Sequence, residues 1–336
     1  MESPRDATVV ITGASSGIGL ATARAFASRG ANVVLAARRR ELLEQAAQEC
    51  EELGGRALAV PTDVTDPGQV SDLKDAAISA FGSIDVWVNN AGTSMWGPFE
   101  EIPLESQSRL VELNLLSAIN GCHAALPHFL VRGGRGVIIN VSSVFGRVPM
   151  PFAAAYSASK AGLAGFTEAL RAELAPRSEI EVCGVYPAYV DTPTYLNSAN
   201  YTGRALRPVP PVVPPERVAE RIVGLALRPR RSVRVGSLHA LAVPHAIAPD
   251  AAGRLVARMG RRFLFRSGPR APDTDGGLFG TVAGRAEARG DWGIPERRRA
   301  RRTAAVAAVL AAGVYGYLLS RRARGVRGAS GGERTR

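Results

Sequence analysis

A short strand, a glycine-rich turn and the start of a helix follow one another at the beginning of this chain. Residues 8–11 (Thr-Val-Val-Ile) are β-branched without polar alternation, which predicts a buried strand. The turn is Thr12-Gly13-Ala14-Ser15-Ser16-Gly17-Ile18-Gly19, and helical spacing follows over Leu20–Arg29. Glycines let a backbone approach a ligand closely, and a helix N-terminus favours anions. The pattern indicates a phosphate-binding βαβ unit, although a plain strand-to-helix turn has the same local appearance.

Strands and helices alternate along the chain up to about residue 240. Further strands are predicted at 32–37, 57–60, 84–89, 137–141, 181–185 and 232–235, and the clearest helices at 40–53 and 156–175. Alternating β and α units predict an α/β fold of the Rossmann type, a doubly wound parallel sheet covered on both faces. A ligand is then expected at the carboxyl ends of the strands, where Gly13, Asn90, Ser143 and Pro187 fall.

Tyr156 and Lys160 stand four residues apart in a helical segment and therefore share one face of that helix. The chain has 42 basic residues, of which only Lys74 and Lys160 are lysines. Arginine fills nearly every other cationic position, so a lysine beside a tyrosine indicates a need for a compact point charge. The alternative is a surface tyrosine with a solvated lysine.

Other motifs follow the same order along the chain. Asn89-Asn90-Ala91-Gly92 follows a predicted strand, Ser143 lies thirteen residues before Tyr156, and Pro187-Ala188-Tyr189-Val190-Asp191-Thr192 follows another strand. Together with the glycine-rich turn and the Tyr–Lys pair, these motifs resemble the short-chain dehydrogenase/reductase family over residues 6–240. The family usually has glycine after the proline, and Ala188 departs from that pattern.

The resemblance implies an oxidoreductase that interconverts a carbonyl and an alcohol with a nicotinamide cofactor. Tyr156 is expected to be the acid/base, with the pKa of its phenol lowered by Lys160 and by the positive nicotinamide. Ser143 is expected to polarise the substrate oxygen, and Asn114 to hold a water linking Lys160 to solvent. Read locally, Ser143 fits a strand-end turn and Asn114 a helix-interior amide. The implied cofactor-binding residues are Gly13, Ser15, Ser16, Gly17, Ile18, Gly19, Arg38, Asp63 (at the adenine), Val64, Asn90, Ala91, Gly92, Tyr156, Lys160, Pro187, Val190 and Thr192.

The end of the second predicted strand indicates which nicotinamide cofactor is used. Dinucleotide folds that use NAD place an acid there to accept from the adenine ribose hydroxyl. This chain has Ala37-Arg38-Arg39-Arg40 instead. An arginine can hold a 2′-phosphate through charge-assisted hydrogen bonds. We therefore predict NADP(H) over NAD(H), the alternative being a solvated arginine cluster at the start of the next helix.

The substrate is expected to be an apolar carbonyl or alcohol. Bulky residues lie in or near the loops around the expected pocket: Trp96, Phe99, Phe145, Met150, Phe152, Tyr189 and Tyr195. The Pro-rich stretch 191–215 is expected to act as a lid. The aromatic residues could equally be packing residues. The family resemblance further implies a homo-oligomer, a dimer or a tetramer.

About a hundred residues follow the predicted dehydrogenase domain, 1–240. Residues 241–266 predict an amphipathic helical extension, either packed on the domain or lying on a membrane or over the pocket. Residues 267–302 are expected to be a linker that ends in a basic cluster. Residues 303–320 predict a possible membrane helix around an apolar run at 304–319, which is short of the roughly 20 residues of a spanning helix. A helix in oligomer contacts and a disordered tail are the alternatives, and 321–336 is expected to be a basic disordered tail.

The net charge of +12 is concentrated at the end of the chain. Residues 297–336 hold eleven arginines and one glutamate, and hence ten of the twelve net positive charges. This distribution favours contact with anionic lipid over a nucleic-acid-binding surface on the enzyme. No secretory signal is recognised, and an odd number of scattered cysteines is typical of a reducing compartment. We therefore predict a cytoplasmic, membrane-associated protein, without a metal site because its histidines lack partners at metal-ligand spacing.

Two functional classes remain open from the sequence. The first is an active NADP(H)-dependent oxidoreductase held at a membrane by its tail. The second is a membrane-associated sensor or partner protein that binds the dinucleotide without turnover. The complete set Asn114, Ser143, Tyr156 and Lys160 favours the first, because a sensor needs the cofactor site but no acid/base.

Overall fold

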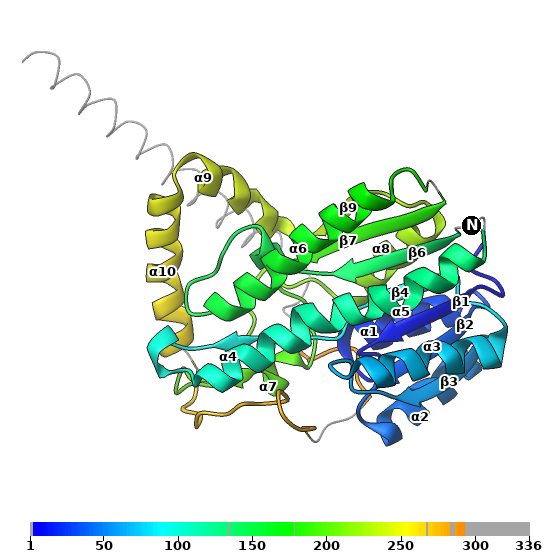
Figure 1. Ribbon diagram of the computed structural model, residues 1–336. Helices are drawn as coiled ribbons and strands as arrows, with labels where there is room; N and C mark the ends of the chain where they lie inside the picture. Colours follow the sequence, from blue (N-terminus) through cyan, green and yellow to red (C-terminus); the bar gives the residue numbers. More distant parts are fainter. Residues whose placement is uncertain (1–2, 134, 178, 267, 283–285, 293–336) are drawn as a thin grey trace, which may run out of the picture.

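A seven-stranded parallel sheet forms the centre of the molecule (Figure 1). The computed structural model describes residues 3–133, 135–177, 179–266, 268–282 and 286–292. The strand order is β3-β2-β1-β4-β6-β7-β9, and the register pairs confirm that each neighbouring pair is parallel. The strands are β1 (Thr8–Thr12), β2 (Asn32–Ala37), β3 (Arg56–Pro61), β4 (Val86–Asn89), β6 (Gly136–Val141), β7 (Ile180–Pro187) and β9 (Ser232–Val235). The predicted doubly wound fold is confirmed.

Helices cover both faces of this sheet, as Figure 1 shows. On one face lie α1 (Gly17–Ala27), α2 (Arg40–Glu52) and α8 (Pro215–Leu227); on the other lie α3 (Pro67–Phe81), α4 (Leu104–Val111), α5 (Ser117–Val131) and α6 (Ala154–Leu174). The sequence of β1 lacks polar alternation because both faces of this strand are buried. Val9 and Ile11 pack in the core under α1, whereas Val10 packs in the core on the opposite face.

The strand order reverses between β1 and β4, because β2 follows on one side of β1 and β6 on the other side of β4. In open α/β sheets, such a reversal opens a crevice at the carboxyl ends of the strands. A small pair of strands, β5 (Met95–Trp96) and β8 (Ala199–Asn200), lies outside the main sheet. The remaining elements before residue 236 are short: η1 (Phe99–Glu101), a π-helical turn η2 (Glu112–Leu116), η3 (Val144–Gly146) and α7 (Thr194–Asn197).

The extension after β9 packs on the domain in its described part. It begins with η4 (Ser237–Leu241), α9 (Ala242–Ile247) and α10 (Pro249–Arg266). Leu264 of α10 is buried, and the Phe265 ring lies 4.9 Å from that of Phe152. One face of α10 therefore packs against the domain. Of the placements that the sequence left open for 241–266, this is packing on the domain.

Residues 268–282 and 286–292 also pack against the domain, although their composition predicts a linker. Leu278 is fully buried and Ala288 nearly so. Gly, Pro and Asp prevent regular helix or strand here, but they do not prevent two apolar side chains from entering the core. The basic cluster at 297–302 and the apolar run at 304–319 lie outside the described residues. Within the described residues, no helix combines the length and apolarity needed to cross a membrane.

Candidate active site

The glycine-rich turn between β1 and α1 packs tightly against the Asn-Ala-Gly motif that follows β4. A Cβ on Gly13, whose φ is +68°, would lie 2.9 Å from the Ala91 Cα atom. A Cβ on Gly19 would lie 2.2 Å from the Gly13 carbonyl oxygen. The Asn90 amide donates to the Thr12 carbonyl at 2.9 Å. Only glycine fits these two positions, so the sequence motif is explained by close backbone packing at the end of β1.

A polar pocket opens at the carboxyl ends of β1, β2 and β3, and we call it the arginine pocket. Its lining residues are Gly13, Ser15, Ser16, Ala37, Arg38, Arg39, Thr62, Asp63, Val64, Ala91, Gly92, Thr93, Leu113, Thr194, Asn197, Gly277, Thr281 and Val282. Eight of the predicted cofactor-binding residues are in this set.

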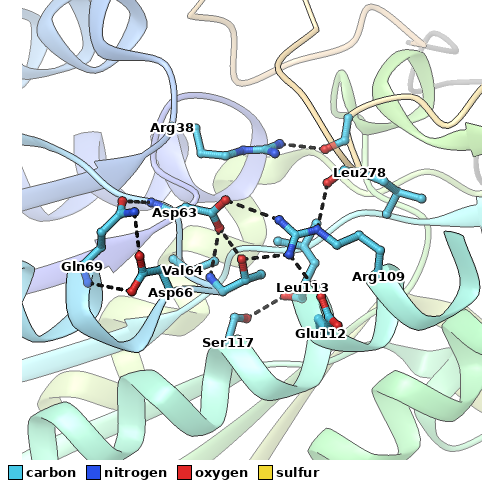
Figure 2. A network of polar contacts seen from close by, with 12 residues as sticks. Arg38, Asp63, Val64, Asp66, Gln69, Arg109, Glu112, Leu113, Ser117 and Leu278 are labelled. Carbon is cyan, nitrogen blue, oxygen red and sulfur yellow. Dashed lines mark hydrogen bonds and ion pairs between the residues drawn. The ribbon is translucent and has the colours of Figure 1, made fainter. Parts of the chain in front are cut away.

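The charge balance of the arginine pocket is positive. Asp63 pairs with Arg109 at 3.3 Å (Figure 2). Burial tends to raise the pKa of the Asp63 carboxyl, but hydrogen bonds from Thr65 and the charges of Arg109 and Arg38 outweigh it and lower that pKa. Arg38 and Arg39 form no ion pair with a carboxylate in the part of the chain that the structure describes. Burial lowers the pKa of both guanidiniums, so two poorly solvated cations face this pocket.

A second pocket adjoins the first at the ends of β4, β6 and β7, and we call it the tyrosine pocket. It is lined by Ile18, Gly92, Thr93, Ser94, Trp96, Val141, Ser142, Ser143, Phe145, Tyr156, Lys160, Pro187, Ala188, Tyr189, Val190, Thr192, Thr194 and Tyr195. Gly92, Thr93 and Thr194 line both pockets. The two pockets therefore form one crevice along the edge of the sheet. Four predicted site residues line neither pocket: Gly17, Gly19, Asn90 and Asn114.

Lys160 and Tyr156 project from α6 into the tyrosine pocket. Lys160 is 5% exposed, and its ammonium donates to the Val141 carbonyl at 3.2 Å. Burial lowers the pKa of Lys160 to about 8. Burial also raises the pKa of the Tyr156 phenol, and a hydrogen bond with Ser143 only partly offsets this. The direction is opposite to the lowering expected from Lys160, because desolvation of the phenol is the larger effect.

Asn114 lies in the π-helical turn η2, between α4 and α5. Its amide nitrogen donates to the Thr93 carbonyl at 3.0 Å and to the Ser159 hydroxyl at 3.1 Å, and its oxygen accepts from the Thr93 amide at 2.9 Å. A Cβ on Gly92 would lie 2.7 Å from the Asn114 side-chain oxygen and 3.3 Å from the Lys160 ammonium nitrogen. Asn114, Gly92 and Lys160 therefore meet at one point. The sequence predicts an ordinary helix here, whereas single π turns occur often at functional sites.

Several aromatic rings line the tyrosine pocket. Phe145 makes edge contacts with Tyr189 at 5.5 Å and with Tyr156 at 6.4 Å between ring centroids. Trp96 and Tyr195 also line the pocket. Of the other aromatic and apolar residues singled out in the sequence, Met150 and Phe152 lie near α10, and Phe99 is 62% exposed.

Ala188, the residue that departs from the family pattern, is accommodated by a glycine after β9. Gly236 has a φ of +105°, and a Cβ there would lie 2.6 Å from the Ala188 Cβ. The methyl group of Ala188 thus fits because position 236 has no side chain.

The side chains that line the crevice suit a dinucleotide in their chemistry. One end offers two arginines that form no ion pair with a carboxylate among the described residues, and the other end offers a phenol and an ammonium on one helix face. Within the described residues, no group of three His, Cys, Asp or Glu side chains is placed to hold a metal ion.

Comparison with known proteins decides the family. A model of the short chain dehydrogenases matches residues 7–200. The chain belongs to the short-chain dehydrogenase/reductase family. It is therefore an NAD(P)-dependent oxidoreductase that acts on CH–OH groups.

Individual relatives cover different parts of this short-chain dehydrogenase. The uncharacterized oxidoreductase YxnA of Bacillus subtilis is 33% identical over 332 residues, covering 95% of this chain and 92% of that protein. The 3beta-hydroxysteroid dehydrogenase 1 of Eggerthella lenta is 43% identical over 187 residues, covering 55% of this chain and 71% of that protein. A crystal structure of a short-chain type dehydrogenase/reductase from Mycobacterium marinum matches with a TM-score of 0.62 and 27% identity, covering 70% of this chain and 96% of that one. The likeness to YxnA thus extends well beyond residue 240.

Several lining residues were not predicted from the sequence. Arg39 adjoins Arg38, and this proximity was the available signal. Thr194 and Asn197 belong to α7, within the predicted lid. Gly277, Thr281 and Val282 gave no signal, because their surroundings have the composition of a linker.

Proposed function

We propose that this enzyme prefers NADP(H) over NAD(H). The observation that carries the proposal is the pair Arg38 and Arg39 in the arginine pocket, since neither forms an ion pair with a carboxylate among the described residues. A 2′-phosphate would supply the missing negative charge through charge-assisted hydrogen bonds. The hydroxyl of Ser15, to which Arg39 donates at 3.2 Å, offers a further hydrogen-bonding group.

We also propose roles for the four residues around the reacting atoms. The nicotinamide, when bound, supplies or accepts the hydride. Tyr156 would give its phenolic proton to the carbonyl oxygen in reduction and remove the hydroxyl proton in oxidation. Ser143, which hydrogen-bonds to Tyr156, would hold the same oxygen. Lys160 would stabilise the phenolate by its charge and bind the nicotinamide ribose, and Asn114 would hold a water that links Lys160 to solvent.

We propose an apolar, bulky secondary alcohol or its ketone as substrate. Phe145, Trp96, Tyr189 and Tyr195 give the tyrosine pocket an aromatic wall. Burial raises the pKa of Tyr189 and Tyr195, so both phenols stay neutral and add no charge. The Eggerthella lenta relative, which is named for a hydroxysteroid, lends support to an alicyclic substrate.

Three further features remain proposals. The protein would be cytoplasmic and would associate with membranes through the arginines and the apolar run of 297–336, whose sequence motivates this. It would form a homo-oligomer, a dimer or a tetramer. The sequence alone left open a dinucleotide-binding sensor without turnover; the juxtaposition of Tyr156, Lys160 and Ser143 in one pocket supports the enzyme instead.

An Arg38→Asp variant tests the cofactor proposal. Wild type is expected to bind NADPH at least about tenfold more tightly than NADH. The variant should lose about 10- to 100-fold in NADPH affinity, because a charge-assisted hydrogen bond becomes a repulsion. NADH affinity should change little. Arg40→Asp is the matched control, since Arg40 is exposed and does not line the pocket. Equal binding of both cofactors by wild type, measured by titration, would show that the preference is absent.

A further inference from the structure

Beyond α10, residues 268–282 return across the domain, and we call this segment the C-terminal strap (orange in Figure 1). Antiparallel bridges join Arg204 to Arg270 and Asn200 to Thr274. The Gly277 amide donates to the Asn197 carbonyl at 2.9 Å. The C-terminal strap is therefore held by backbone hydrogen bonds along the stretch that includes β8.

Asp275 fixes the middle of the C-terminal strap to the domain. Its carboxylate accepts hydrogen bonds from the hydroxyls of Ser106 and Tyr201. Burial, and then this bond to Asp275, raises the pKa of Tyr201, so the phenol stays a donor. Three residues further on, the Leu278 side chain is fully buried and belongs to the core on the sheet face that α3 to α6 cover. One carboxylate and one apolar anchor thus set the position of the residues between them.

The segment from Gly277 to Val282 contacts the arginines of the arginine pocket. Arg38 donates to the Gly277 carbonyl at 2.7 Å, and Arg39 donates to the Val282 carbonyl at 2.9 Å. The Leu278 carbonyl accepts from Arg109, which also pairs with Asp63 (Figure 2). A guanidinium has five donors, and a carbonyl carries no net charge. The C-terminal strap therefore orients Arg38 and Arg39, leaves donors available and does not neutralise the positive charge.

We propose that the C-terminal strap is part of the cofactor site and that Asp275 is a positioning residue for NADP(H) preference. Gly277, Thr281 and Val282 line the same pocket as Arg38 and Arg39, so a bound 2′-phosphate would lie between the strap and the β2–α2 turn. Holding both guanidiniums in place beforehand lowers the entropic cost of binding the phosphate. This inference rests on the proposed NADP(H) preference and extends it to residues outside the matched family region, 7–200.

An Asp275→Ala variant of the full chain tests the proposal through cofactor selectivity. Kd is measured for NADPH and for NADH, and thermal unfolding is measured alongside. Loss of a hydrogen-bonded carboxylate should raise the Kd for NADPH about tenfold and that for NADH less than about threefold, because only the 2′-phosphate uses Arg38 and Arg39. Asp273→Ala is the matched control. It removes the same charge from the same segment, but Asp273 is exposed.

The outcomes separate this inference from the proposed function. In one outcome, wild type prefers NADPH, and the ratio of the Kd for NADPH to the Kd for NADH is the same in Asp275→Ala and Asp273→Ala. This outcome would overturn the role of the strap and leave the cofactor proposal standing. Absence of any preference in wild type would overturn both. If Asp275→Ala does not fold, Tyr201→Phe takes its place, because it removes one hydrogen bond and keeps the ring. A selective rise in the Kd for NADPH would then support the strap, and an unchanged ratio would overturn it.

Discussion

The chemistry of the site depends on how burial and charge compete at two side chains of α6. Desolvation lowers the pKa of Lys160 to about 8 and raises the pKa of Tyr156 above its ordinary value. Both shifts favour the neutral form, which is the usual effect of a low dielectric. The proposed phenolate then needs a positive charge beyond that of Lys160, and the oxidised nicotinamide would supply it. The four-residue spacing predicted that Tyr156 and Lys160 lie on one face of the helix, and both line the tyrosine pocket. The spacing contained no information on how far the pocket excludes solvent.

The buried ammonium of Lys160 should leave a signature in the pH dependence of stability. Its pKa is about 8 in the folded state and 10.5 ordinarily, so the folded protein binds fewer protons between these values. The cost of burying the charge is therefore full below pH 8 and disappears as the pH rises through this window. Relative to Lys160→Met, wild type should gain about 2 kcal/mol in unfolding free energy between about pH 7 and about pH 10. Urea unfolding of both proteins at several pH values measures this gain. If the unfolding free energies of wild type and Lys160→Met change with pH in parallel, the prediction is contradicted.

At the scale of elements, the loop between β4 and β5, the π turn η2 and helix α6 meet at Gly92. The π turn η2 brings the Asn114 amide to Thr93, and α6 brings Lys160 to the same place. Gly92 leaves no room for a side chain there. The loop after β4 thus contacts both η2 and α6. We expect a small displacement of this loop to move the Lys160 side chain without disturbing the hydrophobic core.

A Gly92→Ala variant tests this coupling. The added methyl would lie 2.7 Å from the Asn114 oxygen and 3.3 Å from the Lys160 nitrogen, so one of them must move. We expect kcat/KM to fall at least about tenfold with at most a few kcal/mol lost in stability. Gly165→Ala is the control. Position 165 lies in α6 with no neighbouring atom within 4 Å of a Cβ, and alanine there should stabilise the helix by about 0.5–1 kcal/mol. Unchanged activity in Gly92→Ala would refute the coupling.

Sequence patterns anticipated the sheet better than the surroundings of the site. The runs at 8–11 and 32–37 are buried on both faces, and their apolar content alone marked them as strands. Residues 13, 38, 143, 156 and 160 line the crevice, and their roles in binding and catalysis stay predictions. The π turn at Asn114 could not be anticipated, because its residues fit an ordinary helix. Gly277 and Val282 contribute backbone carbonyls, which leave no trace in side-chain chemistry.

At the scale of the whole molecule, the chain combines a short-chain dehydrogenase domain with an extension that returns to it. In the described part, α10 packs beside Phe152 and the C-terminal strap lines the arginine pocket. The segment 286–292 also contacts the crevice. The Glu287 carbonyl accepts from the Gly17 amide at the start of α1, and the Trp292 indole donates to the Thr192 carbonyl. The described parts of the extension, up to residue 292, therefore pack on the dehydrogenase domain.

Truncation before Arg297 should separate catalysis from membrane association. Every predicted site residue precedes residue 200, and the described extension ends at 292. The shortened protein should keep kcat/KM on a soluble substrate within about twofold and lose its sedimentation with vesicles of anionic lipid. Salt should release the full-length protein if only its arginines hold it, and should fail to do so if residues 304–319 insert. Full-length protein that stays in the supernatant at low salt would contradict membrane association.

Turnover by wild type and Tyr156→Phe tests the central claim, that this crevice performs carbonyl–alcohol oxidoreduction with Tyr156 as acid/base. NADPH consumption is followed with a panel of bulky cyclic ketones, and NADPH binding to both proteins is titrated in parallel. We predict turnover by wild type, a loss of at least about 10²-fold in Tyr156→Phe, and NADPH affinity within about threefold in both. Equal turnover by the two proteins would contradict the role of Tyr156. Tight NADPH binding by wild type without turnover of any ketone in the panel would contradict the proposed bulky cyclic substrate class.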